Sequence, residues 1–429
     1  MSTLYSTPSS SVFAELICLY PTWPVLSAFL ASEIGGGLRI DDLTTPGSPF
    51  ALIRYMKGKS NMGIPHVGAF RSVVWNTMEH KPVSVTPFKS EEGEIITGLS
   101  NLSASVSAEG FIVEQFIDGV LIGQFWDKYS ETWRIHTRTT LDAKCRYFSN
   151  TKTFAEMFGE CSVSIDDLDK NCCYSYIMQH PENRIVCSVS SPRAVLVQRM
   201  VIEASSNHRV DNDATLALRL PGLLTWDAIY TQISMLNALF GHNVQGIVVK
   251  SLVTGHRWKL RTSEYNRVRL MRGNSARLDF LWLSLWHTGK LADYIAIFPE
   301  ERLAADATVN RWKRATNDVY HIYGSVFKAR TLPKSHIPPK YRPLVYGLHT
   351  LYMDALRPAG MTVDWKTTVA YMNERDVAQM LFVINWELRM AAKQLGVPSI
   401  PFESPVSLVS SEAVETQRIR SDFTLPVVA

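Results

Sequence analysis

The sequence predicts an α+β protein in which a strand-rich part precedes a helical part. Up to about residue 273, short runs of β-branched and aromatic residues alternate with turn residues, which is typical of antiparallel strands. Beyond it, apolar residues recur at helical spacing over 278–298, 304–330, 341–356, 365–371 and 374–394. We therefore predict an N-terminal extension, a β-rich domain, a helical domain and a tail, over 1–49, 50–273, 274–395 and 396–429.

The composition is that of a folded protein whose charges nearly balance. Of 429 residues, 46% are hydrophobic and 20% are charged, so the chain is long enough for two or three domains. The formal net charge is only +4, and a nucleic-acid surface would therefore be a local patch. Six cysteines form no C-x-x-C pair, which predicts reduced thiols and no zinc site.

Residues 11–31 are apolar but do not read as a membrane segment. Glu15, Pro21 and Pro24 interrupt the run, and no basic segment precedes it. We expect a helix followed by a turn, no membrane association, and a cytoplasmic protein in a host or viral setting, including packaging in a virion.

The central feature of the β-rich part is a predicted hairpin of strands 113–122 and 133–140. Asp118-Gly119 interrupts its first strand, and a glycine inside a strand marks a bulge or a close approach of backbone to a ligand. We place the functional site there. The other predicted elements are a helix at about 25–33, strands at 50–55, 70–75, 82–90, 174–186, 195–197, 243–250 and 257–261, a long loop at 91–110, and helices at 154–158 and 226–240.

A series of short motifs follows one another in order. They are Arg71, Lys89, Phe116-Ile117-Asp118-Gly119, Pro181-Glu182-Asn183-Arg184-Ile185-Val186, Gln245-Gly246, and Lys259-x-Arg261. This series resembles the RNA ligase and capping-enzyme superfamily of nucleotidyltransferases, and within it the phage-type RNA ligases and the RNA-ligase-like proteins of large double-stranded DNA viruses. The resemblance extends over about 50–360.

The resemblance implies a nucleotidyltransferase domain that uses ATP and Mg²⁺ to activate and join RNA 5′-phosphate ends. GTP-dependent capping shares the same features. It also implies that the nucleotide pocket is lined by Arg71, Glu114, Gly119, Arg138, Lys250, Lys259 and Arg261. Lys259 and Arg261 are two residues apart in a strand, so they share one face, where two cations would neutralise phosphates.

The sequence departs from the family at three positions. The lysine that takes the nucleotide is replaced by Phe116, and the two glutamates are replaced by Ile177 and Gln245. One explanation is that Lys89 serves as the nucleophile, with Asp118 and Glu114 as the carboxylates; the metal ligands are not assigned. The other is a pseudoenzyme that only binds nucleotide or nucleic acid, or has a structural role in a virion.

A cluster of arginines follows the last predicted strand. We interpret Arg257, Arg267, Arg269 and Arg272 as an RNA-binding face, with Trp258, Tyr265 and Trp282 available for stacking on bases. The alternative is a solvated face with no ligand. Oligomeric state is not predicted.

Overall fold

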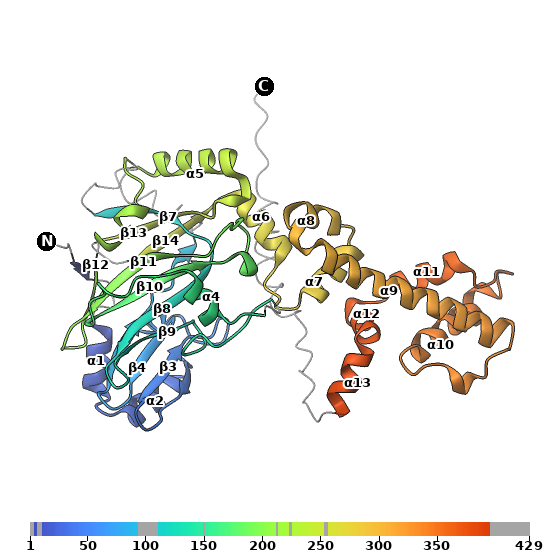
Figure 1. The fold of residues 1–429 in the computed structure, drawn as a ribbon, viewed down its shortest axis with the longest axis horizontal. Coiled ribbons are helices and arrows are strands. Elements are labelled where there is room, and N and C mark those ends of the chain that lie inside the picture. The colour runs from blue at the N-terminus through green and yellow to red at the C-terminus, as the bar shows by residue number, and fades with distance from the viewer. Residues whose placement is uncertain are drawn as a thin grey trace. The chain divides into compact units, whose positions relative to one another are not determined.

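The computed structural model describes residues 4–6, 11–92, 110–148, 151–211, 213–222, 225–252 and 256–394. They belong to two compact units, 1–271 and 272–429. All described strands lie in the first unit, and the second is helical (Figure 1). The predicted α+β class is confirmed. The units divide two residues before the predicted boundary at 273, and the predicted tail, 396–429, lies outside the described residues.

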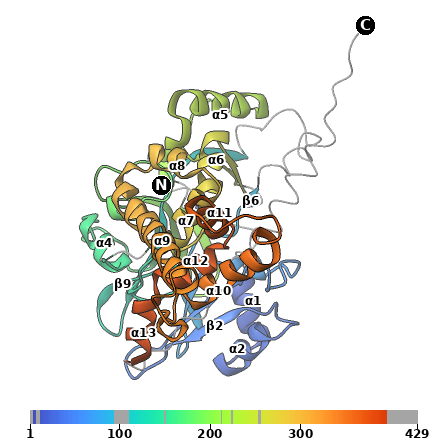
Figure 2. The same ribbon diagram turned by 90° about the vertical axis from the view of Figure 1, so that its right-hand side faces the viewer.

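The N-terminal sheet is four-stranded, in the order β2-β3-β4-β5. Its strands are β2 (Arg39–Asp42), β3 (Phe50–Arg54), β4 (Val73–Asn76) and β5 (Lys81–Val85), and all pairs are antiparallel. Helices α1 (Val12–Leu19) and α2 (Trp23–Ala31) lie beside this sheet (Figures 1 and 2).

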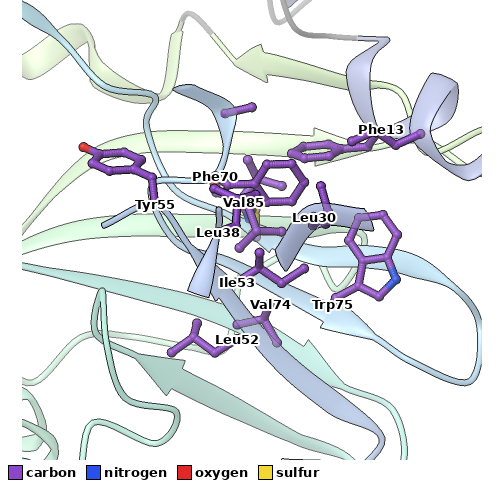
Figure 3. Close-up of a cluster of buried hydrophobic side chains, with 14 of the residues drawn as sticks. Phe13, Leu30, Leu38, Leu52, Ile53, Tyr55, Phe70, Val74, Trp75 and Val85 are labelled. Atoms are coloured by element: carbon purple, nitrogen blue, oxygen red, sulfur yellow. Dashed lines mark hydrogen bonds between the residues drawn. The ribbon is translucent and has the colours of Figure 1, made fainter. Parts of the chain in front are cut away.

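Residues predicted as an N-terminal extension form part of the hydrophobic core that packs on this sheet. Phe13, Leu26 and Leu30 are fully buried, and Phe13 packs edge-on against Phe70 and Trp75 (Figure 3). Burial in the core accounts for the apolar run over 11–31. Among the described residues, no single helix could cross a membrane; α1 and α2 meet the length and composition requirement only as a pair, bent by 111°.

The largest sheet has six strands in the order β1-β12-β11-β10-β8-β9, with every neighbouring pair antiparallel. The strands are β1 (Leu4–Ser6), β8 (Val120–Asp127), β9 (Thr132–His136), β10 (Cys172–Gln179), β11 (Arg193–Ile202) and β12 (His208–Asp211). The helix α4 (Phe154–Glu160) packs on this sheet and begins with a capping box between Thr153 and Glu156.

A third sheet has the order β6-β14-β13-β7. It consists of β6 (Glu91–Glu92), β7 (Phe111–Phe116), β13 (Gly246–Ser251) and β14 (Arg257–Arg261). Helix α5 (Trp226–Phe240) covers one face of it (Figures 1 and 2), and coincides with the helix predicted over 226–240.

The predicted central hairpin is wrong in its first strand. Residues 113–122 are not one bulged strand: β7 belongs to the third sheet, whereas β8 belongs to the six-stranded sheet and forms the hairpin with β9. The break falls at Asp118-Gly119 because Gly119 has φ +150° and a Cβ there would lie 2.4 Å from the carbonyl oxygen of Met178. Only glycine fits this passage between sheets.

The boundary helix α6 (Ser263–Arg272) leads into the helical unit. The later helices are α7 (Leu278–His287), α8 (Leu291–Ile297), α9 (Arg302–Tyr323), α10 (Arg342–Leu351), α11 (Trp365–Asn373), α12 (Val377–Ile384) and α13 (Trp386–Gln394). A core containing Trp312, Val345 and Met380 holds α7, α9, α10 and α12 together. Single π-helical turns, Gly324–Lys328 and Tyr352–Leu356, extend α9 and α10.

Candidate phosphate-binding site

The third sheet has two chemically different faces. Val113, Ile247 and Leu260 are buried on the face that packs against Ile229 of α5. Residues directly opposite one another in a sheet project from the same side. By this register, the other face carries Glu114 and Phe116 of β7, Lys250 of β13, and Arg257, Lys259 and Arg261 of β14. On β7, β13 and β14, side-chain alternation thus gathers four cations and the carboxylate of Glu114 on one surface.

Lys250 and Glu114 form a buried ion pair at the centre of this face. Lys250 Nζ lies 2.5 Å from Glu114 Oε2, and the Thr215 hydroxyl donates to Glu114 Oε1 at 2.5 Å. Burial lowers the pKa of Lys250 to about 8; Glu114 opposes this shift, and the positive charges of Arg257 and Arg219 add to it. A fraction of the Lys250 amine is therefore neutral near pH 7.

Arginines from outside the third sheet approach the same surface. Burial lowers the pKa of Arg71 to about 10, Tyr55 opposes this shift, and the charges of Arg257 and Arg138 add to it. Arg138 donates to the Tyr55 carbonyl at 3.0 Å and lies over the Tyr55 ring at 4.6 Å. Its Nε is buried and has no hydrogen-bond partner within the described residues. Neither Arg71 nor Arg138 is ion-paired there, so each retains charge for an anion.

Lys89, the predicted nucleophile, is solvent-exposed after β5. Its backbone N–H donates to the Gly68 carbonyl at 3.4 Å, and the preceding Phe88 carbonyl accepts from Arg257 Nη1 at 3.5 Å. The chain at Lys89 therefore runs beside β14, at the rim of the cationic face. On that face, Arg261 lies over the ring of Phe116, which occupies the position of the missing lysine.

Asp118, predicted as a catalytic carboxylate, is 6% exposed and joins three segments. Its Oδ2 accepts from the backbone N–H groups of Val186 and Cys187, at 3.0 and 2.9 Å, and its Oδ1 accepts from the Tyr265 hydroxyl at 2.8 Å. Burial and the Asp118 charge raise the pKa of Tyr265, which keeps the phenol as donor. This carboxylate holds the passage between the sheets together, and both of its oxygens accept hydrogen bonds.

The arrangement does not fit the Mg²⁺ that the resemblance implies. Ile177 and Gln245 stand where glutamates were expected, while Glu114 and Asp118 are bound to Lys250, Thr215 and the groups around the passage. Within the described ranges, no three His, Cys, Asp or Glu side chains form a group suited to a metal ion. Mg²⁺ prefers several oxygen ligands, and the residues here do not supply them.

The predicted RNA-binding arginines differ in position. Arg267 and Arg269 are exposed on α6, and Arg267 pairs with Glu264 at 2.9 Å. Arg272 is wrong as a surface residue: it is 3% exposed, pairs with Glu301 at 2.9 Å and hydrogen-bonds Tyr294. The expected stacking residues Trp258, Tyr265 and Trp282 are also buried and present no face to a base.

Several residues at the site carried no sequence signal. Thr215 and Arg219 reach Glu114 and Lys250 from a short 3₁₀ segment about a hundred positions further along the chain than Glu114. Tyr55 ends the strand predicted over 50–55, but only the fold brings it under Arg138. Each pairing depends on contacts between sheets, which alternation within one strand cannot indicate.

Comparison with known proteins gives weak matches. No family model matches the chain. An RNA ligase of Rhodothermus phage RM378 is 24% identical over 140 residues, which is 27% of this chain and 31% of that protein. The chain resembles this RNA ligase in sequence, and the match spans less than a third of the relative.

Solved structures similar to the chain have low superposition scores. They include a putative ATP-dependent DNA ligase from Aquifex aeolicus, at 12% identity over 83% of this chain and 77% of the other, with a TM-score of 0.35. Two forms of an archaeal ATP-dependent RNA ligase match at 12% and 11% identity, over 97% of this chain and 92% of theirs, with TM-scores of 0.34 and 0.37.

Proposed function

We propose that the N-terminal unit is a ligase-like nucleotidyltransferase that binds ATP through its phosphates and acts on RNA 5′-phosphate ends. One observation carries the proposal: cations from separate elements are close enough to affect one another. The charges of Arg138 and Arg257 act on Arg71, and the charge of Arg257 acts on Lys250, which is paired with Glu114. Like charges held this closely repel one another, and a bound anion would relieve that repulsion. A polyphosphate carries enough charge to do so.

Lys250 is the amine best suited to attack the nucleotide. A lysine nucleophile needs a lowered pKa, and Lys250 has one because it is buried among cations. In the proposed step, Nζ forms a bond to the α-phosphorus, the bond from that phosphorus to the bridging oxygen breaks, and pyrophosphate leaves with the electron pair. Glu114, at 2.5 Å, takes the proton from Nζ. Lys89 remains the alternative nucleophile.

The cations on the same face would stabilise the charge that develops in this step. Arg257 of β14 lies opposite Lys250 of β13 in the strand register, and Lys259 and Arg261 follow on the same face of β14. Pyrophosphate gains negative charge as it leaves, and fixed cations stabilise that charge without moving.

The second candidate is a protein that binds nucleotide or RNA but transfers nothing. Phe116 at the lysine position, stacked beneath Arg261, favours it, because a phenyl ring cannot form a phosphoramide. The two candidates share the cationic face and differ only in chemistry. GTP in place of ATP remains a variant of the first.

Covalent labelling separates the candidates. The full chain is incubated with α-³²P-ATP, and separately with α-³²P-GTP, with a divalent cation added to complex the nucleotide. Label that survives denaturing gel electrophoresis is expected in the wild type and in Lys89→Ala, and is expected to disappear in Lys250→Arg, which keeps the charge but removes the amine. Label lost only in Lys89→Ala would return the role to Lys89. No label, in protein that still binds ATP, would leave only the second candidate.

Binding is tested separately by calorimetry with tripolyphosphate. Arg71→Ala and Arg138→Gln should each weaken binding about tenfold or more, because each removes a charge-assisted contact. Arg39→Ala is the matched control, since Arg39 is an exposed arginine paired with Asp41 on β2. Equal affinities in all four proteins would rule out this face as the phosphate site.

A further inference from the structure

The helical unit contains a concentration of positive charge that the proposed function does not use. Between residues 324 and 363 the only acidic residue is Asp354, and the cations are Lys328, Arg330, Lys334, Lys340, Arg342 and Arg357. Their excess is greater than the net charge of the whole chain, +4. Within the described part of the chain, only Lys340 among these six is ion-paired, with Glu387 at 2.5 Å, and the other five are exposed.

Aromatic rings lie among these cations because two helices end in π-helical turns. The turn after α9 is closed by the Ala329 N–H bonding to the Gly324 carbonyl at 2.9 Å, and the turn after α10 by Arg357 N–H and the Tyr352 carbonyl at 2.8 Å. Each wider turn changes the direction of the side chains that follow. Such turns are rare and recur at functional sites.

One ring from each of the two turns stacks with His349 of α10. Phe327 of the first turn is parallel to His349 of α10, with ring centroids 3.7 Å apart and planes 13° apart. His349 in turn stacks with Tyr352 of the second turn at 6.0 Å. Burial, together with the charge of Lys334, lowers the pKa of His349, so its ring is neutral at pH 7. In Figure 1, α10 lies beside the C-terminal half of α9, which brings the turns together.

The outer rim of this stack is open to solvent. Tyr346 is 41% exposed and meets Phe327 edge-on, with centroids 6.5 Å apart. Lys334 Nζ lies 5.4 Å from the centroid of the Phe327 ring. An exposed ring next to exposed cations, in a segment with a single acidic residue between 324 and 363, matches a ligand that has both flat faces and negative charge.

We propose that Phe327, Lys334, Tyr346, His349 and Tyr352 form a binding surface for single-stranded nucleic acid. A base would stack on the exposed ring of Tyr346, supported by the rings behind it, and the neighbouring phosphates would contact Lys334 and Arg330. Stacking on aromatic rings tolerates any base, so the surface would bind with little sequence preference. It lies wholly within the helical unit and is independent of the phosphate site.

The test is fluorescence anisotropy of the full chain with a labelled 12-nucleotide oligouridylate that lacks a 5′-phosphate. Tyr346→Ala should weaken binding about 5- to 100-fold, the range expected for one stacked base, and Tyr346→Phe should retain it. Tyr230→Ala is the matched control, because Tyr230 of α5 is exposed to a similar extent, 43%. Lys334→Ala should weaken binding and reduce the slope of log affinity against log salt by about one.

An abasic version of the oligonucleotide separates stacking from charge. Tyr346→Ala and wild type should bind it equally, whereas Lys334→Ala should still bind it less well. Wild-type affinity for the abasic strand equal to that for oligouridylate, or unchanged oligouridylate binding by Tyr346→Ala, would overturn the proposal.

To separate RNA binding at this surface from binding at the phosphate site, the Tyr346→Ala comparison is repeated in an Arg71→Ala background. Two sites that share no residues are expected to contribute additively, so the same loss is expected there. A loss that vanishes in that background would assign the binding to the first site and reject this one. Tripolyphosphate affinity of Tyr346→Ala should equal that of wild type.

Discussion

Removing one member of the Lys250–Glu114 pair should destabilise the protein more than removing both charges. Lys250→Met removes the ion-pair partner of the Glu114 carboxylate, which is 2% exposed; among the hydrogen bonds of the described residues, that from the Thr215 hydroxyl remains. Loss of one partner of a buried ion pair costs about 3–5 kcal/mol. Lys250→Met combined with Glu114→Gln removes the uncompensated charge and keeps an oxygen for Thr215. The double variant should therefore be more stable than the single one.

The pair should also make stability rise with pH in a defined window. The pKa of Lys250 is about 8 in the folded protein, against 10.5 for an unperturbed lysine. Between these values the unfolded chain binds a proton that the folded protein has released, so the free energy of unfolding increases with pH. The gain is about 1.4 kcal/mol per pH unit at most, and about 3 kcal/mol across the window. More than about one unit below pH 8 the amine is protonated in both states, and this group contributes almost no slope.

Urea unfolding of wild type and of the double variant at pH 7, 8, 9 and 10 measures this effect. Other groups oppose it: burial raises the pKa of Cys173 to about 12, which lowers stability as pH rises above 9. Both proteins share those groups, so the difference between the two curves isolates Lys250. Identical slopes between pH 8 and 10 would show that Lys250 is not the buried, partly neutral amine described above.

Two further substitutions test the fold around the site. Gly119→Ala should lower the free energy of unfolding by more than about 2 kcal/mol, because a positive φ is strained for alanine and its Cβ would meet the Met178 carbonyl. Gly58→Ala is the control, because Gly58 also has a positive φ but lies in open space, so its loss should be smaller. Equal losses in thermal denaturation would contradict the close approach at Gly119. Arg272→Met should destabilise the helical unit by up to about 3–5 kcal/mol in urea denaturation, because Glu301 loses its ion-pair partner and keeps only the hydrogen bonds from Trp282 and Tyr294 among those of the described residues. A stable variant with weaker RNA binding would instead support the surface role predicted from the sequence.

The sequence predicted the elements better than their partners. Alternation placed Lys259 and Arg261 on one face, and the structure has them there because Trp258 and Leu260 enter the core beneath α5. Apolar periodicity located α5 because one stripe of that helix packs on the sheet. These are properties of a single segment. They require no knowledge of the remaining chain.

What the sequence did not predict depends on contacts between distant segments. A strand pattern continues through Asp118-Gly119, and only the strand pairing, of β7 with β13 and of β8 with β9 and β10, shows that the chain changes sheet there. Arg272 belongs to a dense run of arginines that reads as a surface. Its burial follows from Glu301, which lies 29 residues further along the chain.

The replaced motif positions lead to a last prediction, on divalent cations. Phe116 packs under Arg261, and Glu114 is neutralised by Lys250. On β7, β13 and β14 the cationic face therefore has no carboxylate left to share a metal with the ligand. Mg²⁺ would then reduce the charge of a bound polyphosphate without gaining protein ligands. Tripolyphosphate should therefore bind at least as tightly in EDTA as in Mg²⁺, and more weakly at high salt. Calorimetry in both buffers measures this, and a tenfold loss of affinity in EDTA would mean that carboxylates in this site hold a metal after all.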